Sequence, residues 1–182
     1  MADGTIITSV TDALAVCSNI IESANNEVVY ISPPSLLVLA SQFGLREKTK
    51  MLIQKAGSVR SIADFSYPYI DEMRGLLDIG EGVRHVSQYQ GIFMLVGDRR
   101  ESISSMSIDV KSLSIDTPVV ALWSDDPTYA EYLMSTFETA WGQAVPAVQR
   151  IEELLKEGPP QVLLNEVYVL PVLHVNVIHI LR

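Results

Sequence analysis

Apolar positions along this chain are spaced by three to four residues in some segments and run almost continuously in others. The first spacing predicts amphipathic helices, and the second predicts buried strands. Helices are expected over residues 8–24, 35–56, 67–79 and 127–157. Strands are expected over residues 27–31, 59–64, 83–87, 92–96, 101–108 and 118–123.

Several residues predict where these elements begin and end. Ser9 or Thr11 can cap the first helix, and Asp126 followed by Pro127 is a strong start for the helix at 127–157. Gly44 predicts a break within 35–56, and Pro146 predicts a kink within 127–157, because proline removes a helical hydrogen bond.

Strands that alternate with helices predict an α/β fold. We expect a mixed, mainly parallel sheet with helices on both faces, and an antiparallel part at one side where residues 97–100 connect two strands as a hairpin. Residues 1–158 are expected to form this domain. Residues 159–182 are expected to be a separate apolar C-terminal extension.

The extension carries few charges: from residue 161 onward only Glu166 and Arg182 are charged. Its alternating pattern favours one or two strands that dock on the domain or on a partner. A membrane span or a disordered tail remains an alternative. Pro171, His174 and His179 argue against a span, since polar groups are costly at the centre of a bilayer.

The chain is acidic, with 22 acids against 13 bases in 182 residues and a net charge of −9. Because lysine and arginine supply most of the affinity for phosphates, we expect no direct nucleic-acid binding. No signal-peptide pattern stands at the N-terminus, so a cytoplasmic protein without membrane contact is expected. The single cysteine, Cys17, is expected to be a small buried apolar side chain.

Four segments in this order resemble the phospholipase D-like domain of the TrmB-type archaeal transcription regulators. They are Gly57 to Ser66, Gly82-Val-Arg-His-Val86, Gly91 to Asp98, and Ala121 to Pro127. The closing helix, with Phe137 and Trp141, is similar as well. The resemblance covers about residues 9–157 and implies one half of a phospholipase D-like fold. It also implies a sensing or dimerisation module and a homodimer.

Enzymes of the phospholipase D family carry the motif His-x-Lys-x-x-x-x-Asp, in which the histidine is the nucleophile and the lysine binds the substrate phosphate. If Asp98 occupies the aspartate position, the lysine position holds Phe93 and the histidine position holds Gly91. A phenyl ring cannot neutralise a phosphate, and glycine cannot attack phosphorus. The resemblance therefore implies the fold without this catalytic activity.

No motif for a nucleotide, a cofactor or a catalytic serine is present, and we expect no cofactor. His174 and His179 are five residues apart, so neither a strand nor a helix would make them a local chelate, and no metal site is expected. His85, on a predicted strand, is expected to be a hydrogen-bonded structural residue.

Polar residues follow the predicted strands where ligand sites of open α/β sheets gather. They are Ser32, Asp64, Ser66, Ser87 and Tyr89. Because they include no obvious nucleophile and base, this set suits binding of a small polar ligand better than catalysis.

We therefore expect a non-catalytic regulatory domain, either a stand-alone relative or the regulatory part of a longer protein, since no winged helix fits before residue 9. One alternative is a phosphodiesterase-type hydrolase with a rearranged site, for which His85 is the best candidate. Another is an adaptor that binds only a protein partner.

Overall fold

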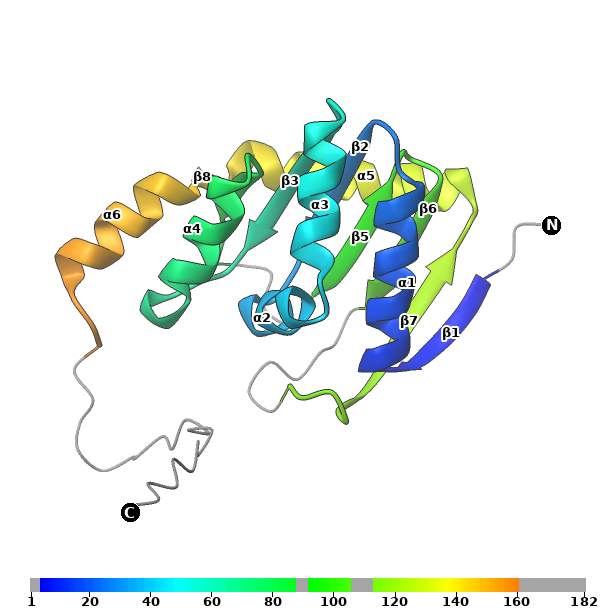
Figure 1. The fold of residues 1–182 in the computed structure, drawn as a ribbon, viewed down its shortest axis with the longest axis horizontal. Coiled ribbons are helices and arrows are strands. Elements are labelled where there is room, and N and C mark those ends of the chain that lie inside the picture. Colours follow the sequence, from blue (N-terminus) through cyan, green and yellow to red (C-terminus); the bar gives the residue numbers. More distant parts are fainter. Residues whose placement is uncertain (1–3, 88–91, 106–112, 161–182) are drawn as a thin grey trace, which may run out of the picture.

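The computed structural model describes residues 4–87, 92–105 and 113–160. They form an eight-stranded sheet in the order β1-β7-β6-β5-β2-β3-β4-β8, with helices on both faces (Figure 1). The strands are β1 (Gly4–Ser9), β2 (Glu27–Ile31), β3 (Ser58–Ala63), β4 (Gly82–His85), β5 (Phe93–Gly97), β6 (Glu101–Ser105), β7 (Pro118–Ser124) and β8 (Val145–Pro146). The α/β class and the mixed sheet are confirmed.

The helices lie close to the predicted segments. They are α1 (Val10–Ser23), α2 (Pro34–Gln42), α3 (Leu45–Gln54), the short 3-10 helix η1 (Tyr67–Tyr69), α4 (Ile70–Asp78), α5 (Pro127–Gln143) and α6 (Ala147–Glu157). The expected break at Gly44 is confirmed, and this residue has a φ of 78°, which suits glycine. Ser9 and Asp126 cap α1 and α5 through their side chains.

Parallel pairing is confined, in the described part of the chain, to β2 with β3 and β3 with β4. On its other side β2 pairs antiparallel with β5, which continues through β6 and β7 to β1. Thus β2 joins a parallel part of the sheet to an antiparallel part that is larger than the sequence suggested. Strand β1 was not predicted from the sequence, and it forms because β7 offers an edge for residues 4–9.

The side chains of β2 alternate between two cores on opposite faces of the sheet. Val28 and Tyr30 belong to the core beneath α1, α3 and α4, and Val29 and Ile31 to the core beneath α5. All four side chains are almost completely buried. Burying a side chain of this size contributes roughly 1.5–3 kcal/mol. The central strand therefore holds both layers of helices to the sheet.

Pro146 separates two helices rather than kinking one. Its neighbour Val145 pairs with His85 of β4, so the chain adopts a two-residue strand, β8, between α5 and α6. The residue before a proline is biased towards extended conformations, and β4 supplies an unpaired edge. This short strand turns α6 towards α4 and η1 (Figure 1).

No helix in the described ranges is long and apolar enough to cross a membrane. The cytoplasmic location stays a prediction, as does the boundary between a domain at 1–158 and an extension. The strands expected after residue 160 lie outside the described residues.

The hairpin between β5 and β6 is tied to the start of β2 by one carboxylate. Asp98 accepts the backbone N–H groups of Asn25, Asn26 and Glu27 at 2.8, 2.9 and 2.8 Å, and its own N–H donates to the carbonyl of Glu27. Although partial burial opposes it, these three bonds lower the pKa of Asp98. Asp98 thus has a structural role at the turn.

Replacing Asp98 with alanine should destabilise the fold by about 2–3 kcal/mol, because charged hydrogen bonds to three backbone groups are lost. Alanine is also strained at the φ of 48° that Asp98 adopts. Asp98→Asn tolerates this φ and keeps one oxygen as the acceptor for Asn26 and Glu27, but it loses the charge and the acceptor for Asn25, so it should destabilise the fold less than alanine does. Urea unfolding measures both, and wild-type stability in Asp98→Ala would contradict the structural role.

Candidate ligand-binding site

The predicted ligand residues follow β2, β3 and β4, whose carboxyl ends lie at one edge of the sheet. Ser32 is buried directly after β2, and Asp64 is half-buried directly after β3. Ser66 and Ser87 are exposed, and Tyr89 lies outside the described residues. The predicted ligand residues therefore lie in different environments. Of those that the structure describes, Ser32 alone lines a cavity. Ligand binding by this set stays a prediction.

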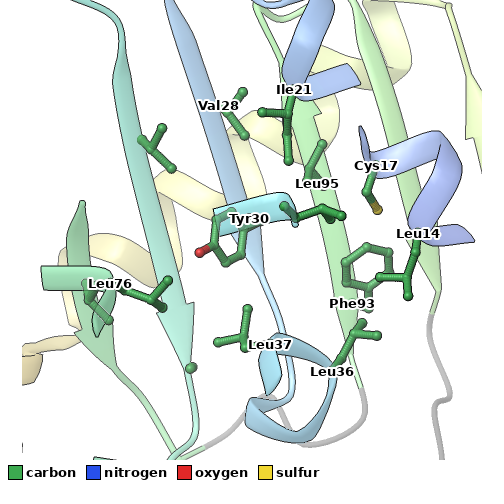
Figure 2. Packing of buried hydrophobic residues seen from close by; sticks show 14 of the residues in the cluster. Leu14, Cys17, Ile21, Val28, Tyr30, Leu36, Leu37, Leu76, Phe93 and Leu95 are labelled. Carbon is green, nitrogen blue, oxygen red and sulfur yellow. The ribbon is translucent and has the colours of Figure 1, made fainter. Parts of the chain in front are cut away.

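The cavity lies between the sheet and the helices α1, α2 and α3. It has a volume of about 60 Å³, and its walls are almost entirely apolar. Figure 2 shows Leu14 of α1, Leu36 and Leu37 of α2, and Phe93 of β5 around this region. The sequence gives no signal for a cavity here, because these residues follow the same periodicity that any buried helix face requires.

Cys17 also lines the cavity and is 3% exposed. Burial raises the pKa of its thiol to about 12. A thiol in this state is not a nucleophile, since the reactive form is the thiolate. The prediction of a small buried apolar side chain is confirmed.

Phe93 lines the cavity and is 5% exposed, and its correspondence with the family's phosphate-binding lysine stays a prediction. Phe93 lies opposite Ser105 in the register between β5 and β6. The Ser105 hydroxyl donates to the carbonyl of Val120 at 2.7 Å, and Ser104 shares a hydrogen bond with the Tyr129 hydroxyl on the other face. Both hydroxyls are thus engaged in hydrogen bonds within the protein. Gly91 lies outside the described residues.

His85 packs beside the start of the loop that follows β3. Its Nδ1 accepts the backbone N–H of Phe65 at 3.3 Å, and its ring contacts the Phe65 ring edge-on at 5.0 Å. Desolvation lowers the pKa of His85, although the nearby Asp64 carboxylate acts in the opposite direction. With Nδ1 accepting, the proton of the neutral ring is on Nε2. This arrangement fits the structural role expected for His85.

A buried polar group lies beside the cavity, under α3 and α4. The Tyr30 hydroxyl donates to Oε1 of Glu81, which is 3% exposed, and the Ser61 hydroxyl lies next to them. Burial raises the pKa of Glu81 to about 7, while Ser61, Tyr30 and the Arg46 guanidinium partly offset this effect. The second oxygen of Glu81 has no hydrogen-bond partner in the described part of the chain. A buried glutamate that titrates near neutral pH was not predicted from the sequence.

Arg46 closes this end of the cavity. Its guanidinium forms an ion pair with Glu72 of α4 and packs against Gly75, where a Cβ atom would approach Nη1 to 2.9 Å. A side chain at position 75 would require the guanidinium to shift. The cavity therefore has a long apolar wall and one polar end.

Known proteins are similar to this chain in structure and not in sequence. No protein-family model matches it, and no curated protein matches it in sequence. Among solved structures, the archaeal chromatin protein TrmBL2 matches with a TM-score of 0.61 and 13% identity, over 79% of this chain and 54% of its own. This chain thus spans about half the length of TrmBL2.

Two further solved structures match over almost their whole length. Nuc from Salmonella typhimurium, a phospholipase D family member, has a TM-score of 0.62 and 13% identity, over 80% of this chain and 98% of its own. NucT from Helicobacter pylori has a TM-score of 0.62 and 15% identity, over 80% and 99%. The chain has a phospholipase D-like fold related to that of TrmB-type proteins, as its motifs indicated.

The expectation of no direct nucleic-acid binding was wrong. It rested on the net charge of −9, but a DNA-binding chromatin protein has this fold. Net charge is a sum over the whole surface, whereas nucleic acid contacts one part of it, so an acidic total does not exclude such binding. The homodimer stays a prediction.

The raised pKa of Glu81 predicts a specific dependence of stability on pH. Below about pH 4.5 Glu81 is protonated in both the folded and the unfolded chain. At these pH values its burial does not lower the free energy of unfolding. Between pH 4.5 and about 7 only the unfolded chain releases the proton, so stability falls as pH rises, by about 3 kcal/mol in total.

Glu81→Gln keeps the acceptor for Tyr30 and should remove this fall. Urea unfolding at pH 4.5 to 8 should therefore show a wild-type curve that approaches and then drops below that of Glu81→Gln. Glu152→Gln changes an exposed glutamate and serves as the control, with a curve parallel to the wild type. Parallel curves for all three proteins would show that Glu81 does not titrate in this range.

Proposed function

We propose that this chain is a non-catalytic regulatory domain that senses a small ligand, in a protein related to the archaeal transcription regulators of TrmB type. The shared fold with TrmBL2 supports the relation to these proteins. One observation carries the sensing role: Phe93, which we assign to the position of the family's phosphate-binding lysine, lines an apolar cavity. The same place in the fold is thus suited to an uncharged group and not to a phosphate.

Electrostatics support this interpretation. A phosphate needs cations or several hydrogen-bond donors around it, because burying an unpaired charge is costly. The cavity instead presents leucine, valine and phenylalanine side chains, and Arg46, the one cation among the described residues that line it, is already paired with Glu72. These apolar walls also disfavour the small polar ligand expected from the sequence.

The alternative of a hydrolase with a rearranged site depends on His85. A nucleophilic histidine must offer an unprotonated nitrogen to the substrate. Here Nδ1 accepts a backbone N–H and Nε2 carries the proton, so neither nitrogen is available for attack. An adaptor without a ligand would explain neither the cavity nor its polar end.

We expect no phosphodiesterase activity. The purified chain should hydrolyse bis(p-nitrophenyl) phosphate no faster than His85→Gln and no faster than buffer. The reason is that the nitrogens of His85 are both engaged, Gly91 at the expected nucleophile position has no side chain, and Phe93 cannot bind a phosphate. A rate well above buffer that is lost in His85→Gln would favour the hydrolase instead.

A ligand that binds only the folded state raises its stability by about 2.7 kcal/mol at 100 times its Kd. A thermal-shift screen of metabolites should therefore find compounds that raise the Tm of the wild-type chain by several degrees. Ala40→Leu projects a larger side chain into the cavity and should abolish the shift, whereas Ala15→Leu, at an exposed position of α1, should not. No shift, or equal shifts in Ala40→Leu, would contradict a ligand in this cavity.

A further inference from the structure

One face of the sheet is open at the end formed by β7 and β1. Helix α5 packs on this face over β2, β5 and β6. Beyond the helix, Val120 and Ile6 are 66% and 60% exposed, and Leu122 lies directly opposite Ile6 in the register between β1 and β7. Together with Tyr129 of α5, these side chains line an open groove of about 540 Å³. A contiguous apolar groove of this kind is typical of a surface that contacts a partner.

Strand β1 also offers a free edge. It pairs with β7 on one side, and no strand of the described residues adds to its other side. The backbone N–H and C=O groups along such an edge can pair with a further strand. Every second side chain of an added strand would lie on the same face as Ile6, beside the groove. The groove and the edge together therefore fit an extended segment that has one apolar face.

The chain itself contains such a segment after the described residues. Leu173, Val175 and Val177 alternate with His174 and Asn176. This alternation predicts a strand with one apolar face and one polar face. No charged residue lies between positions 166 and 182, so the segment brings no charge to the apolar groove.

The distance along the molecule decides which copy of the chain supplies the segment. Strands β8 and β1 stand at opposite ends of the sheet, about 34 Å apart at the usual strand spacing. Helix α6 runs from β8 away from β1 (Figure 1), and its length adds about 16 Å. Residues 158–172 span at most about 50 Å when fully extended, which leaves no slack for a path around the surface. A second copy of the chain is not bound by this limit.

We propose that segment 173–177 of a second copy of this chain pairs with the free edge of β1 and places Leu173, Val175 and Val177 beside the groove. Because both copies carry the same groove and the same segment, a reciprocal exchange closes a dimer. The groove lies on the α5 face of the sheet and the cavity on the α1 face, so this interface does not depend on the sensing function.

The oligomeric state of the full chain tests the proposal. Analytical ultracentrifugation should show a concentration-dependent dimer for the wild type. Val120→Asp in the groove and Val175→Asp in the segment should each weaken this dimer about tenfold or more, because a carboxylate would be buried against apolar side chains. Val148→Asp, at an exposed position of α6, and Asn176→Asp, on the polar face of the segment, are controls that should leave the dimer intact. Circular dichroism checks that each variant is folded.

Cross-linking shows whether the contact joins two copies. Cys17 is 3% exposed, so a cysteine introduced at the surface reacts in its place. Copies with Ile6→Cys that carry a mass label are mixed with unlabelled copies with Val175→Cys and treated with a short bismaleimide. We expect a product that contains one labelled and one unlabelled chain, and none when Val148→Cys replaces Ile6→Cys.

Three results would overturn the proposal. One is a wild-type chain that stays monomeric. Another is a dimer that persists in both Val120→Asp and Val175→Asp, because the contact would then lie on a different surface. The third is loss of the dimer in only one of these two variants, because groove and segment would then not contact each other. None of these results bears on the thermal-shift screen, which tests the cavity separately.

Discussion

The position of β2 between β3 and β5 is the constraint on which the rest of the structure depends. This strand is parallel to one neighbour and antiparallel to the other, and its side chains enter the cores on both faces. A shift of one residue in its register would exchange Val28 and Tyr30 with Val29 and Ile31. Both layers of helices would then lose their partners. Asp98 helps to fix the register, because it ties the start of β2 to the hairpin after β5.

The same pairing creates the candidate site. Since β5 is antiparallel to β2, the first residue of β5 lies near the end of β2, and Phe93 meets Ser32 at one cavity. That Phe93 occupies the lysine position of the phospholipase D motif stays a prediction. The fold accommodates a phenylalanine at this place because the neighbouring helices supply further apolar side chains.

Glu81, unlike Phe93, places a polar carboxyl group in the same core. A leucine there would avoid the desolvation of a carboxyl group and the unpaired oxygen, so the present arrangement lowers stability at neutral pH. Its position next to Tyr30 and near Arg46 connects it to the polar end of the cavity. Such a cost is typical of residues retained for a site rather than for packing alone.

Local chemistry along the sequence determined the elements and their limits. Ser9 and Asp126 cap helices because their oxygens reach backbone N–H groups two or three residues away, and Gly44 breaks a helix because it tolerates a positive φ. Only tertiary contacts decided the rest. Strand β1 exists because β7 pairs with it, and β8 because β4 has a free edge. The cavity at Phe93 and the raised pKa of Glu81 depend on which distant side chains surround each group, and no spacing within the sequence encodes those distances.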